Sequence, residues 1–137
     1  MTTNREQLHP FLTEFCRWAA SHPDILAVAL LGSYARDEAT RASDVDLLII
    51  VMEPKKYLED TWWAQSFGTI SRQRGDNYGK VISLRVWYTG SHQVEYSFTE
   101  ETWCALPFDE GTEKVISGGM EILRERELIL SRLERHI

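Results

Sequence analysis

The sequence predicts an α/β (α+β) fold in which a mixed β-sheet carries helices mainly on one face. Two short apolar runs, over residues 25–31 and 47–51, are typical of buried strands. Two later segments, over 81–88 and 93–98, alternate apolar and polar side chains on either side of a turn at 89–91. Because segments with helical periodicity flank these strands, helices packed against one sheet are the expected architecture.

The expected elements follow the order helix, strand, short helix, strand, helix, strand, strand, helix. The first helix ends before His22-Pro23, and its apolar residues recur at helical spacing: Leu8, Phe11, Leu12, Phe15 and Trp18. Residues 34–36 are expected to form a short helical turn after the first strand. Pro54 then opens a helix over 55–67.

The last third of the chain predicts a loop, a hairpin and a helix. Residues 71–80 are polar and turn-rich, which indicates a flexible loop before the strand at 81–88. A final helix is expected from about residue 114 to residue 135, where apolar residues recur.

Length and composition predict one domain over residues 1–137 that works in the cytoplasm. A chain of 137 residues supports one core, and a hydrophobic content of 43% is ordinary for a globular protein. The sequence contains neither an apolar run near the ~20 residues of a membrane span nor a secretory signal pattern. The net charge of -6 argues against nucleic acid as a partner, and no cysteine and histidine spacing matches a zinc site.

Two aspartates mark the start of the apolar run at 47–51. Asp44 and Asp46 are two residues apart, so in a strand they project from the same side. Carboxylates held this close repel each other and are costly to desolvate together unless a cation is present. Such oxygen ligands suit Mg²⁺ or Mn²⁺, which take further ligands from water and substrate phosphates. The alternative is a pair of solvated aspartates at the entrance to a strand.

A glycine-serine turn follows the first apolar run. Gly32 lets the backbone turn sharply or approach a ligand closely, and amides at the start of the next short helix suit an anion such as phosphate. Ser33 offers a hydroxyl, although it also suits the N-cap of that helix. For Arg36 the alternative to a ligand role is a surface ion pair with Asp37 or Glu38.

The order Gly32-Ser33, ten residues, then Asp44-Val45-Asp46 resembles the signature of the DNA polymerase beta type nucleotidyltransferase superfamily. This superfamily includes the aminoglycoside and lincosamide adenylyltransferases and small stand-alone nucleotidyltransferases of prokaryotes. Arg36 and Ser43 stand where many members carry an arginine and a serine. The resemblance implies the nucleotidyltransferase fold over nearly the whole chain, with the turn residues, Arg36 and Ser43 binding the nucleotide.

Members of this superfamily use a third carboxylate from a later strand, and Glu95 is the candidate here. After Asp46, Glu95 is the only acidic residue inside a predicted strand. It shares a face of 93–98 with Gln93 and Ser97, while the apolar residues project from the other face. The alternative is an exposed residue on an edge strand, because alternation does not say which face meets the site.

The resemblance implies in-line attack of an acceptor hydroxyl on the α-phosphorus of a nucleoside triphosphate, with ATP as co-substrate and pyrophosphate leaving. Asp44, Asp46 and Glu95 would ligate two Mg²⁺ (or Mn²⁺) ions about 4 Å apart. Glu95 would bind the metal nearest the acceptor or act as the base toward its hydroxyl. The implied activity is Mg-dependent nucleotidyl transfer.

Three functions fit these residues. The first is adenylyl transfer to a small molecule such as an antibiotic, with an acceptor pocket formed by the loop at 71–80, aromatic residues and a second subunit. The second is an antitoxin-type enzyme that binds or adenylylates a helical toxin, with Trp62-Trp63 or Trp103 as exposed interface anchors. The third is a nucleotide or metal binder without turnover. A homodimer is expected, because a monomer would leave the acceptor site open to water.

Overall fold

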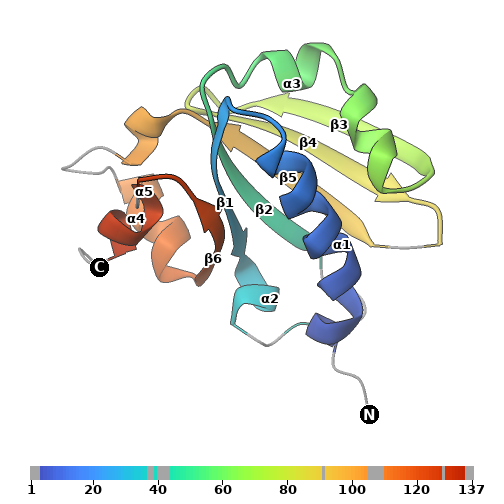
Figure 1. The fold of residues 1–137 in the computed structure, drawn as a ribbon, viewed down its shortest axis with the longest axis horizontal. Helices are drawn as coiled ribbons and strands as arrows, with labels where there is room; N and C mark the ends of the chain where they lie inside the picture. Colours follow the sequence, from blue (N-terminus) through green and yellow to red (C-terminus); the bar gives the residue numbers. More distant parts are fainter. Residues whose placement is uncertain are drawn as a thin grey trace.

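In the described part of the chain, a mixed sheet of six strands is the centre of the fold (Figure 1). The computed structural model describes residues 4–36, 39, 44–90, 92–104, 110–127 and 129–134. The strands are β1 (Ile25–Leu31), β2 (Val45–Val51), β3 (Ile70–Asn77), β4 (Val81–Tyr88), β5 (Gln93–Thr99) and β6 (Met120–Glu125). They lie in the order β3-β4-β5-β2-β1-β6, with β2 and β5 parallel and the other neighbours antiparallel. The predicted mixed sheet is confirmed.

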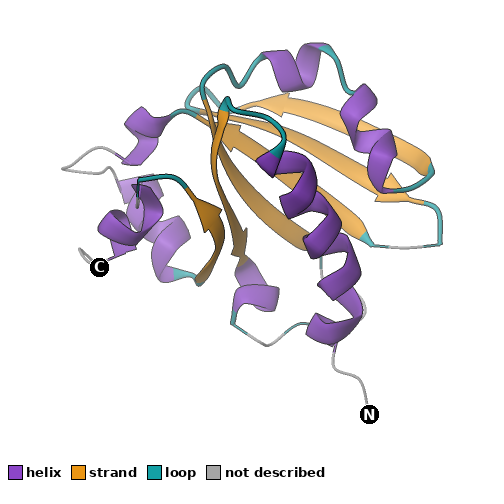
Figure 2. Cartoon of the chain, in the orientation of Figure 1, coloured by secondary structure: helices purple, strands orange, loops and turns teal. Residues whose placement is uncertain are grey.

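The main helical layer lies on one face, and a smaller layer covers part of the other (Figure 2). Helix α1 (Asn4–Ala20) crosses the first face, as the sequence predicts. The shorter helical segments are α2 (Gly32–Ala35), α3 (Lys56–Glu59), η1 (Trp62–Phe67), η2 (Glu101–Cys104), α4 (Glu110–Ser117) and α5 (Ile129–Glu134). The helix predicted over 55–67 is therefore present as two segments, α3 and η1, with a break at residues 60–61.

The larger core lies between α1 and the sheet. Leu8, Leu12 and Phe15 of α1 are at most 4% exposed and belong to the same buried cluster as Tyr96 and Phe98 of β5. Phe15 stacks on Tyr96 with 5.5 Å between ring centroids. Full burial of each such apolar side chain contributes about 1.5–3 kcal/mol, so this layer holds β5 firmly in place.

The opposite face has its own core where β1 and β2 are covered. Its buried residues come from β1, β2 and the short helices, and they are Ala27, Ala29, Leu48, Ile50, Trp103, Ile116 and Leu130. Because alternate residues of a strand point to opposite faces, β1 and β2 are packed on both sides. This packing fixes the ends of β1 and β2, which meet at Leu31 and Asp46.

The prediction of a flexible loop over 71–80 is wrong, because most of this segment is the edge strand β3. Gln73 and Gly75 pair in register with core residues of β4, so they lie on the same side of the sheet as the larger core, although both are exposed. Gln73 Nε2 donates to Thr61 Oγ1 at 3.1 Å, and a Cβ on Gly75 would lie 2.5 Å from a methyl carbon of Leu58. Neither position carries an apolar side chain, so the alternation that marks a strand is missing from the sequence.

The prediction of one helix from residue 114 to residue 135 is also wrong. The segment contains the end of α4, then β6, then α5. Gly118 and Gly119 follow α4, and Gly119 has φ +113°, a conformation that ends the helix and that other residues rarely adopt. Strand β6 then pairs with the free edge of β1, from Leu31↔Met120 to Ala27↔Glu125. Pairing with a distant strand outweighs the local helical spacing of the apolar residues.

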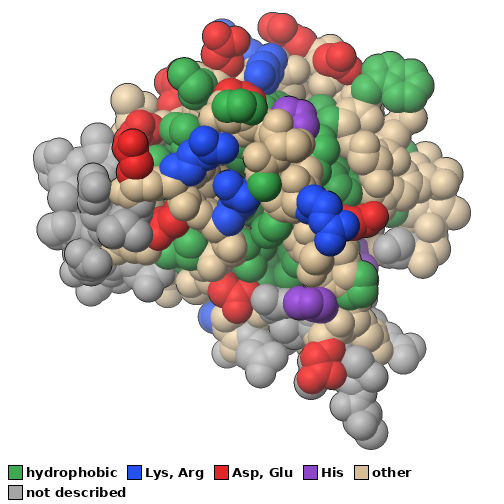
Figure 3. All heavy atoms as spheres, in the orientation of Figure 1, with side chains coloured by type: hydrophobic (Ala, Val, Ile, Leu, Met, Phe, Trp, Pro, Cys, Tyr) green, Lys and Arg blue, Asp and Glu red, His purple; other side chains and the backbone are tan. Residues whose placement is uncertain are grey.

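Charged side chains are interspersed over the face that α1 crosses (Figure 3). Acidic and basic groups of the described residues alternate there with polar and apolar ones. Within the described residues, no helix combines the length and apolar character needed to cross a bilayer.

Two buried tyrosines join β4, β5 and η1. The Tyr88 hydroxyl donates to the Ala64 carbonyl at 2.7 Å, and the Tyr96 hydroxyl lies 2.8 Å from the Tyr88 oxygen. Since the Tyr88 hydroxyl donates its proton to the Ala64 carbonyl, the Tyr96 hydroxyl is the donor in its bond to the Tyr88 oxygen.

We expect the two hydroxyls to contribute unequally to stability. Tyr88→Phe removes both bonds and leaves the buried Tyr96 hydroxyl without its acceptor, and should lower the free energy of unfolding by about 2 kcal/mol. Tyr96→Phe leaves the bond to Ala64 intact and should cost about 1 kcal/mol or less. Urea unfolding measures both losses. Equal losses, or a larger loss for Tyr96→Phe, would contradict this order of donors.

Candidate active site

Three charged side chains lie side by side on adjacent strands. In the sheet register Asp46 of β2 is the partner of Glu95 of β5, and Glu95 is the partner of Arg85 of β4. Residues paired in register project from the same face of a sheet. This face is opposite to the one on which Leu47 and Tyr96 enter the larger core. The parallel pairing therefore brings together two of the carboxylates that the sequence singled out in separate segments.

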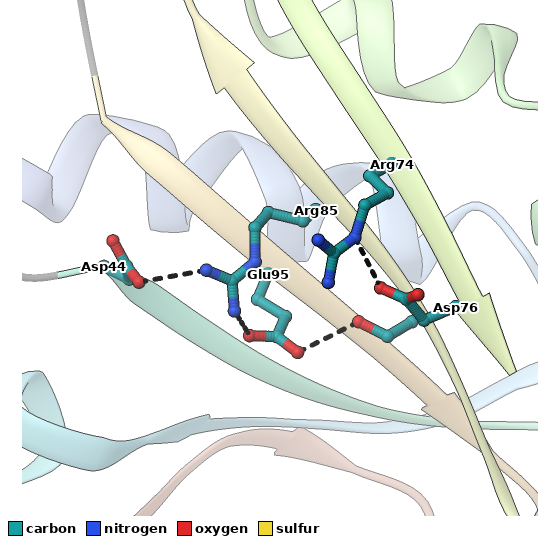
Figure 4. A network of polar contacts seen from close by, with 6 residues as sticks. Asp44, Arg74, Asp76, Arg85 and Glu95 are labelled. Carbon is teal, nitrogen blue, oxygen red and sulfur yellow. Dashed lines mark hydrogen bonds and ion pairs between the residues drawn. The ribbon is translucent and has the colours of Figure 1, made fainter. Parts of the chain in front are cut away.

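Arg85 lies between Glu95 and the third carboxylate, Asp44 (Figure 4). Its Nη2 donates to Glu95 Oε2 at 2.5 Å, and its Nη1 lies 3.5 Å from Asp44 Oδ2. The other oxygen of Glu95 accepts a hydrogen bond from the Ser83 hydroxyl at 3.0 Å. The three charged side chains are 24–36% exposed, so water screens these ion pairs only in part.

Sequence reasoning missed Arg85 and Ser83. Both lie in the correctly predicted strand at 81–88, on the face opposite the core residues Leu84 and Val86. The alternation in this strand carried a signal for both residues. The polar faces of two strands in a hairpin adjoin each other, and the polar face of the strand at 93–98 carries Glu95. The positions of the partners depend on the hairpin register, which the turn alone did not establish.

Asp46 is surrounded by like charge. Burial and the negative charges of Glu95 and Asp44 raise the pKa of Asp46 to about 6, against an opposing effect of Arg85. A carboxylate in such surroundings is stabilised in its ionised form by an added cation. The cluster is therefore electrostatically suited to bind positive charge.

Gly32 makes room for the Asp46 carboxylate. It follows β1 directly and has φ +70°, in the region that favours glycine. A Cβ at this position would lie 2.9 Å from Asp46 Oδ2. The glycine turn and the aspartate pair, which the sequence offers as two separate motifs, are thus in direct proximity.

The remaining predicted ligands occupy different surroundings. Ser33 lies in the first turn of α2, whose N-cap is Leu31 without a side-chain cap bond, so Ser33 is not the cap. The Arg36 guanidinium donates to the Gly118 carbonyl, which attaches the glycine turn to the segment before β6. Ser43 lies outside the described residues, as do the proposed ion-pair partners of Arg36.

The donor set suits a hard divalent cation. Asp44, Asp46 and Glu95 offer carboxylate oxygens, the ligands that Mg²⁺ and Mn²⁺ prefer. As the side chains stand, no three His, Cys, Asp or Glu residues of the described ranges are gathered closely enough to hold a metal ion. The Arg85 guanidinium separates Asp44 from Glu95, so joint coordination requires side chains to rearrange.

A cavity of about 590 Å³ lies elsewhere on the protein. Its lining includes Lys55, Lys80, Thr99 and Trp103, and none of the three carboxylates. Thr99 is four residues beyond Glu95, about 13 Å along β5. The three carboxylates therefore lie at the other end of the strands, away from this cavity.

Comparison with solved structures shows a known fold. An aminoglycoside 6-adenyltransferase from Bacillus subtilis aligns over 73% of this chain with a TM-score of 0.53 and 14% sequence identity. A nucleotidyltransferase-like protein from Exiguobacterium sibiricum aligns over 90% of this chain with a TM-score of 0.46 and 19% identity. The alignment spans 36% of the length of each of these proteins. No curated protein sequence matches the chain.

The family follows from the sequence of the region that holds the site. Residues 11–99 match the model of the nucleotidyltransferase domain. The match covers more than half of the chain, from α1 to the end of β5, and includes Gly32, Asp44, Asp46 and Glu95. With this fold and this match, the protein belongs to the nucleotidyltransferase domain family.

Proposed function

We propose that this protein transfers a nucleoside monophosphate from a nucleoside triphosphate, with ATP as the first candidate, to a hydroxyl group of an acceptor. The proposal rests on Asp46 and Glu95 standing in register on two parallel strands, with Asp44 joined to Glu95 through Arg85. In the reaction the acceptor oxygen bonds to the α-phosphorus and its proton is released. The bond from the α-phosphorus to the bridging oxygen breaks, and pyrophosphate leaves.

The turn after β1 would bind the triphosphate. Gly32 brings the backbone close to Asp46, and Ser33 adds a hydroxyl in the same turn. Amides and hydroxyls at such a turn favour phosphate oxygens. Arg36 supports this turn through its bond to Gly118 and adds positive charge to it. We assign Ser43 to the same group from its place in the sequence.

Asp44, Asp46 and Glu95 would hold the divalent metal. Bound there, Mg²⁺ or Mn²⁺ supplies positive charge to the oxygens of the reacting phosphate. The Ser83 hydroxyl donates to Glu95 Oε1 at 3.0 Å. This favours Glu95 as an oriented ligand over Glu95 as the base for the acceptor proton.

A small hydroxylated molecule is the first candidate acceptor. The fold is shared with an aminoglycoside 6-adenyltransferase, which makes this class of acceptor the natural one to examine. On the carboxylate face, the exposed Arg74 of β3 is the register partner of Arg85. A polar strand surface, in place of the predicted loop, would therefore border the bound acceptor.

A protein acceptor or partner is the second candidate, favoured by the exposure of Trp62. Trp62 is 72% exposed at the start of η1, whereas Trp103 is only 7% exposed. Trp63 packs edge-on against Tyr96 with 4.8 Å between ring centroids. Of the three predicted interface anchors, Trp62 is the one that presents an aromatic surface to a partner.

Labelled nucleotide distinguishes these functions. The protein is incubated with Mg²⁺ and ATP labelled on the α-phosphate, together with an aminoglycoside panel or a cell lysate. Label on a small molecule supports the first function, and label on a protein supports the second. Absence of transfer with every nucleoside triphosphate and acceptor would leave a binder without turnover.

We expect Asp44→Asn and Asp46→Asn to reduce transfer by about a hundredfold or more, because each removes charge from the site. Circular dichroism should show an unchanged fold. Glu14→Gln is the control, since Glu14 is an exposed acid of α1 on the opposite side of the sheet. Transfer at the wild-type rate by either site variant would overturn the assignment of the site.

Gly32→Ala should abolish transfer while Gly90→Ala should not. The two glycines have nearly equal angles, φ +70° and φ +68°, so alanine costs about 1 kcal/mol of backbone strain at either position. Only at Gly32 does the added methyl group press on Asp46, since a Cβ on Gly90 meets no atom within 4 Å. Thermal unfolding measures the backbone strain in both variants, and the labelled-ATP assay measures the loss of nucleotidyl transfer in Gly32→Ala. Equal activity of both variants would show that this contact is unimportant.

Asp46→Asn should stabilise the metal-free protein at neutral pH. Because the pKa of Asp46 is raised to about 6 on folding, the advantage of its protonated form is complete below about pH 4 and is lost as the pH rises through 6. Replacing the carboxylate should therefore add about 2 kcal/mol at pH 7.5, discounted for partial exposure, and progressively less toward pH 4. Unfolding with a chelator present at several pH values tests this. A gain independent of pH would contradict the titration of Asp46.

A further inference from the structure

We infer that Arg85 is an internal counter-ion, which must withdraw from Asp44 and Glu95 before these carboxylates bind a divalent cation; this inference rests on the proposed function. Arg85 is then a positioning residue rather than a catalytic one. It stabilises the metal-free arrangement of the carboxylates and competes with the metal for the same oxygens.

The geometry places one planar cation between two of the three acids. Arg85 Nη2 is 2.5 Å from Glu95 Oε2, and Nη1 is 3.5 Å from Asp44 Oδ2 (Figure 4). The guanidinium thus uses the carboxylate oxygens that a metal would need. In agreement with this, the acids of the described residues include no group of three that is gathered for metal binding.

The charges on β3 and β4 form two separate pairs. Arg74 lies directly opposite Arg85 in the register and on the same face, and like charges in this position repel. Arg74 Nε pairs with Asp76 at 2.9 Å, while Arg85 turns toward Glu95 and Asp44. Because Asp76 neutralises the exposed Arg74, Arg74 contributes little to the position of Arg85.

Linkage determines the sign of the effect. An interaction that exists only in the metal-free protein stabilises that state and weakens metal binding by the same free energy. Removing Arg85 should then destabilise the metal-free protein and tighten metal binding. If Arg85 instead kept its contacts in the metal-bound protein, its removal would change metal affinity only through the loss of one positive charge, as in the removal of Arg74.

Titration of Mn²⁺ followed by electron paramagnetic resonance tests the inference with Arg85→Gln. We expect Mn²⁺ to bind about tenfold more tightly than to the wild type, since charge-assisted hydrogen bonds that are partly screened by water are lost from the metal-free state alone. Melting with a chelator present should occur at a lower temperature. Arg74→Gln removes the same charge from the adjacent strand, but Arg74 pairs with Asp76 and not with Asp44 or Glu95. The Mn²⁺ affinity of this variant should therefore stay within about twofold of the wild type.

Two further variants keep the test decisive. Adding Asp46→Asn to Arg85→Gln should remove the tight Mn²⁺ binding, which places the ion at this site. Should Arg85→Gln fail to fold, Arg85→Lys replaces it, because a single ammonium bridges two carboxylates less well than a guanidinium and should also tighten binding. Unchanged or weaker Mn²⁺ binding by the Arg85 variant would overturn the inference, as would an equal gain in Arg74→Gln.

The outcome for Arg85 is separable from the outcome for the proposed function. If the wild type transfers nucleotide but Arg85→Gln binds Mn²⁺ no more tightly, the inference fails alone. If no acceptor is labelled but Arg85→Gln binds Mn²⁺ more tightly, the counter-ion role stands and the proposed transfer fails.

Discussion

The parallel pairing of β2 with β5 is the constraint on which the site depends. It runs from Val45↔Val94 to Ile50↔Thr99 without a shift, and it places Asp46 beside Glu95. The register is held by the other face of the same strands, where Leu47 and Tyr96 are fully buried. A slip of one residue would turn the whole apolar set of β5 out of the core and Glu95 into it. The core on one face therefore sets the spacing of the acids on the other.

The site concentrates negative charge at a cost to the folded state. Asp46 lies close to two other acids, and burial together with their negative charge raises its pKa. Arg85 and Ser83 offset part of this cost by bonding to Glu95. In the proposed metal site, stability and metal affinity are thus opposed, because whatever neutralises the acids in the metal-free protein also competes with the ion. Such a trade-off is expected where strongly charged groups are held together for chemistry.

Residues with strong local signals allow most of the fold to be predicted, together with the candidate residues that the structure brings close to one another. The apolar runs identify β1 and β2, alternation identifies β4 and β5, and the spacing of the motif identifies Gly32, Asp44 and Asp46. Strands β3 and β6 escape prediction because their pairing depends on distant partners. In β3 the positions paired with core residues are Gln73 and Gly75, which are not apolar, so the alternating pattern of a strand is missing. The apolar spacing of β6 also fits a helix. The role of Arg85 could not be predicted for a related reason, because it depends on the hairpin register that places Arg85 opposite Glu95.

The bond between Arg36 and the Gly118 carbonyl has a consequence for the order of assembly. It joins the glycine turn to a segment that follows all three acids in the chain and lies beyond the matched family region. Long-range contacts of this kind form late, because a long stretch of chain must first be brought together. During synthesis the acids and the turn emerge before the segment that braces them. The turn at Gly32, to which the proposed function assigns the triphosphate, therefore acquires this support only after β6 has docked on β1.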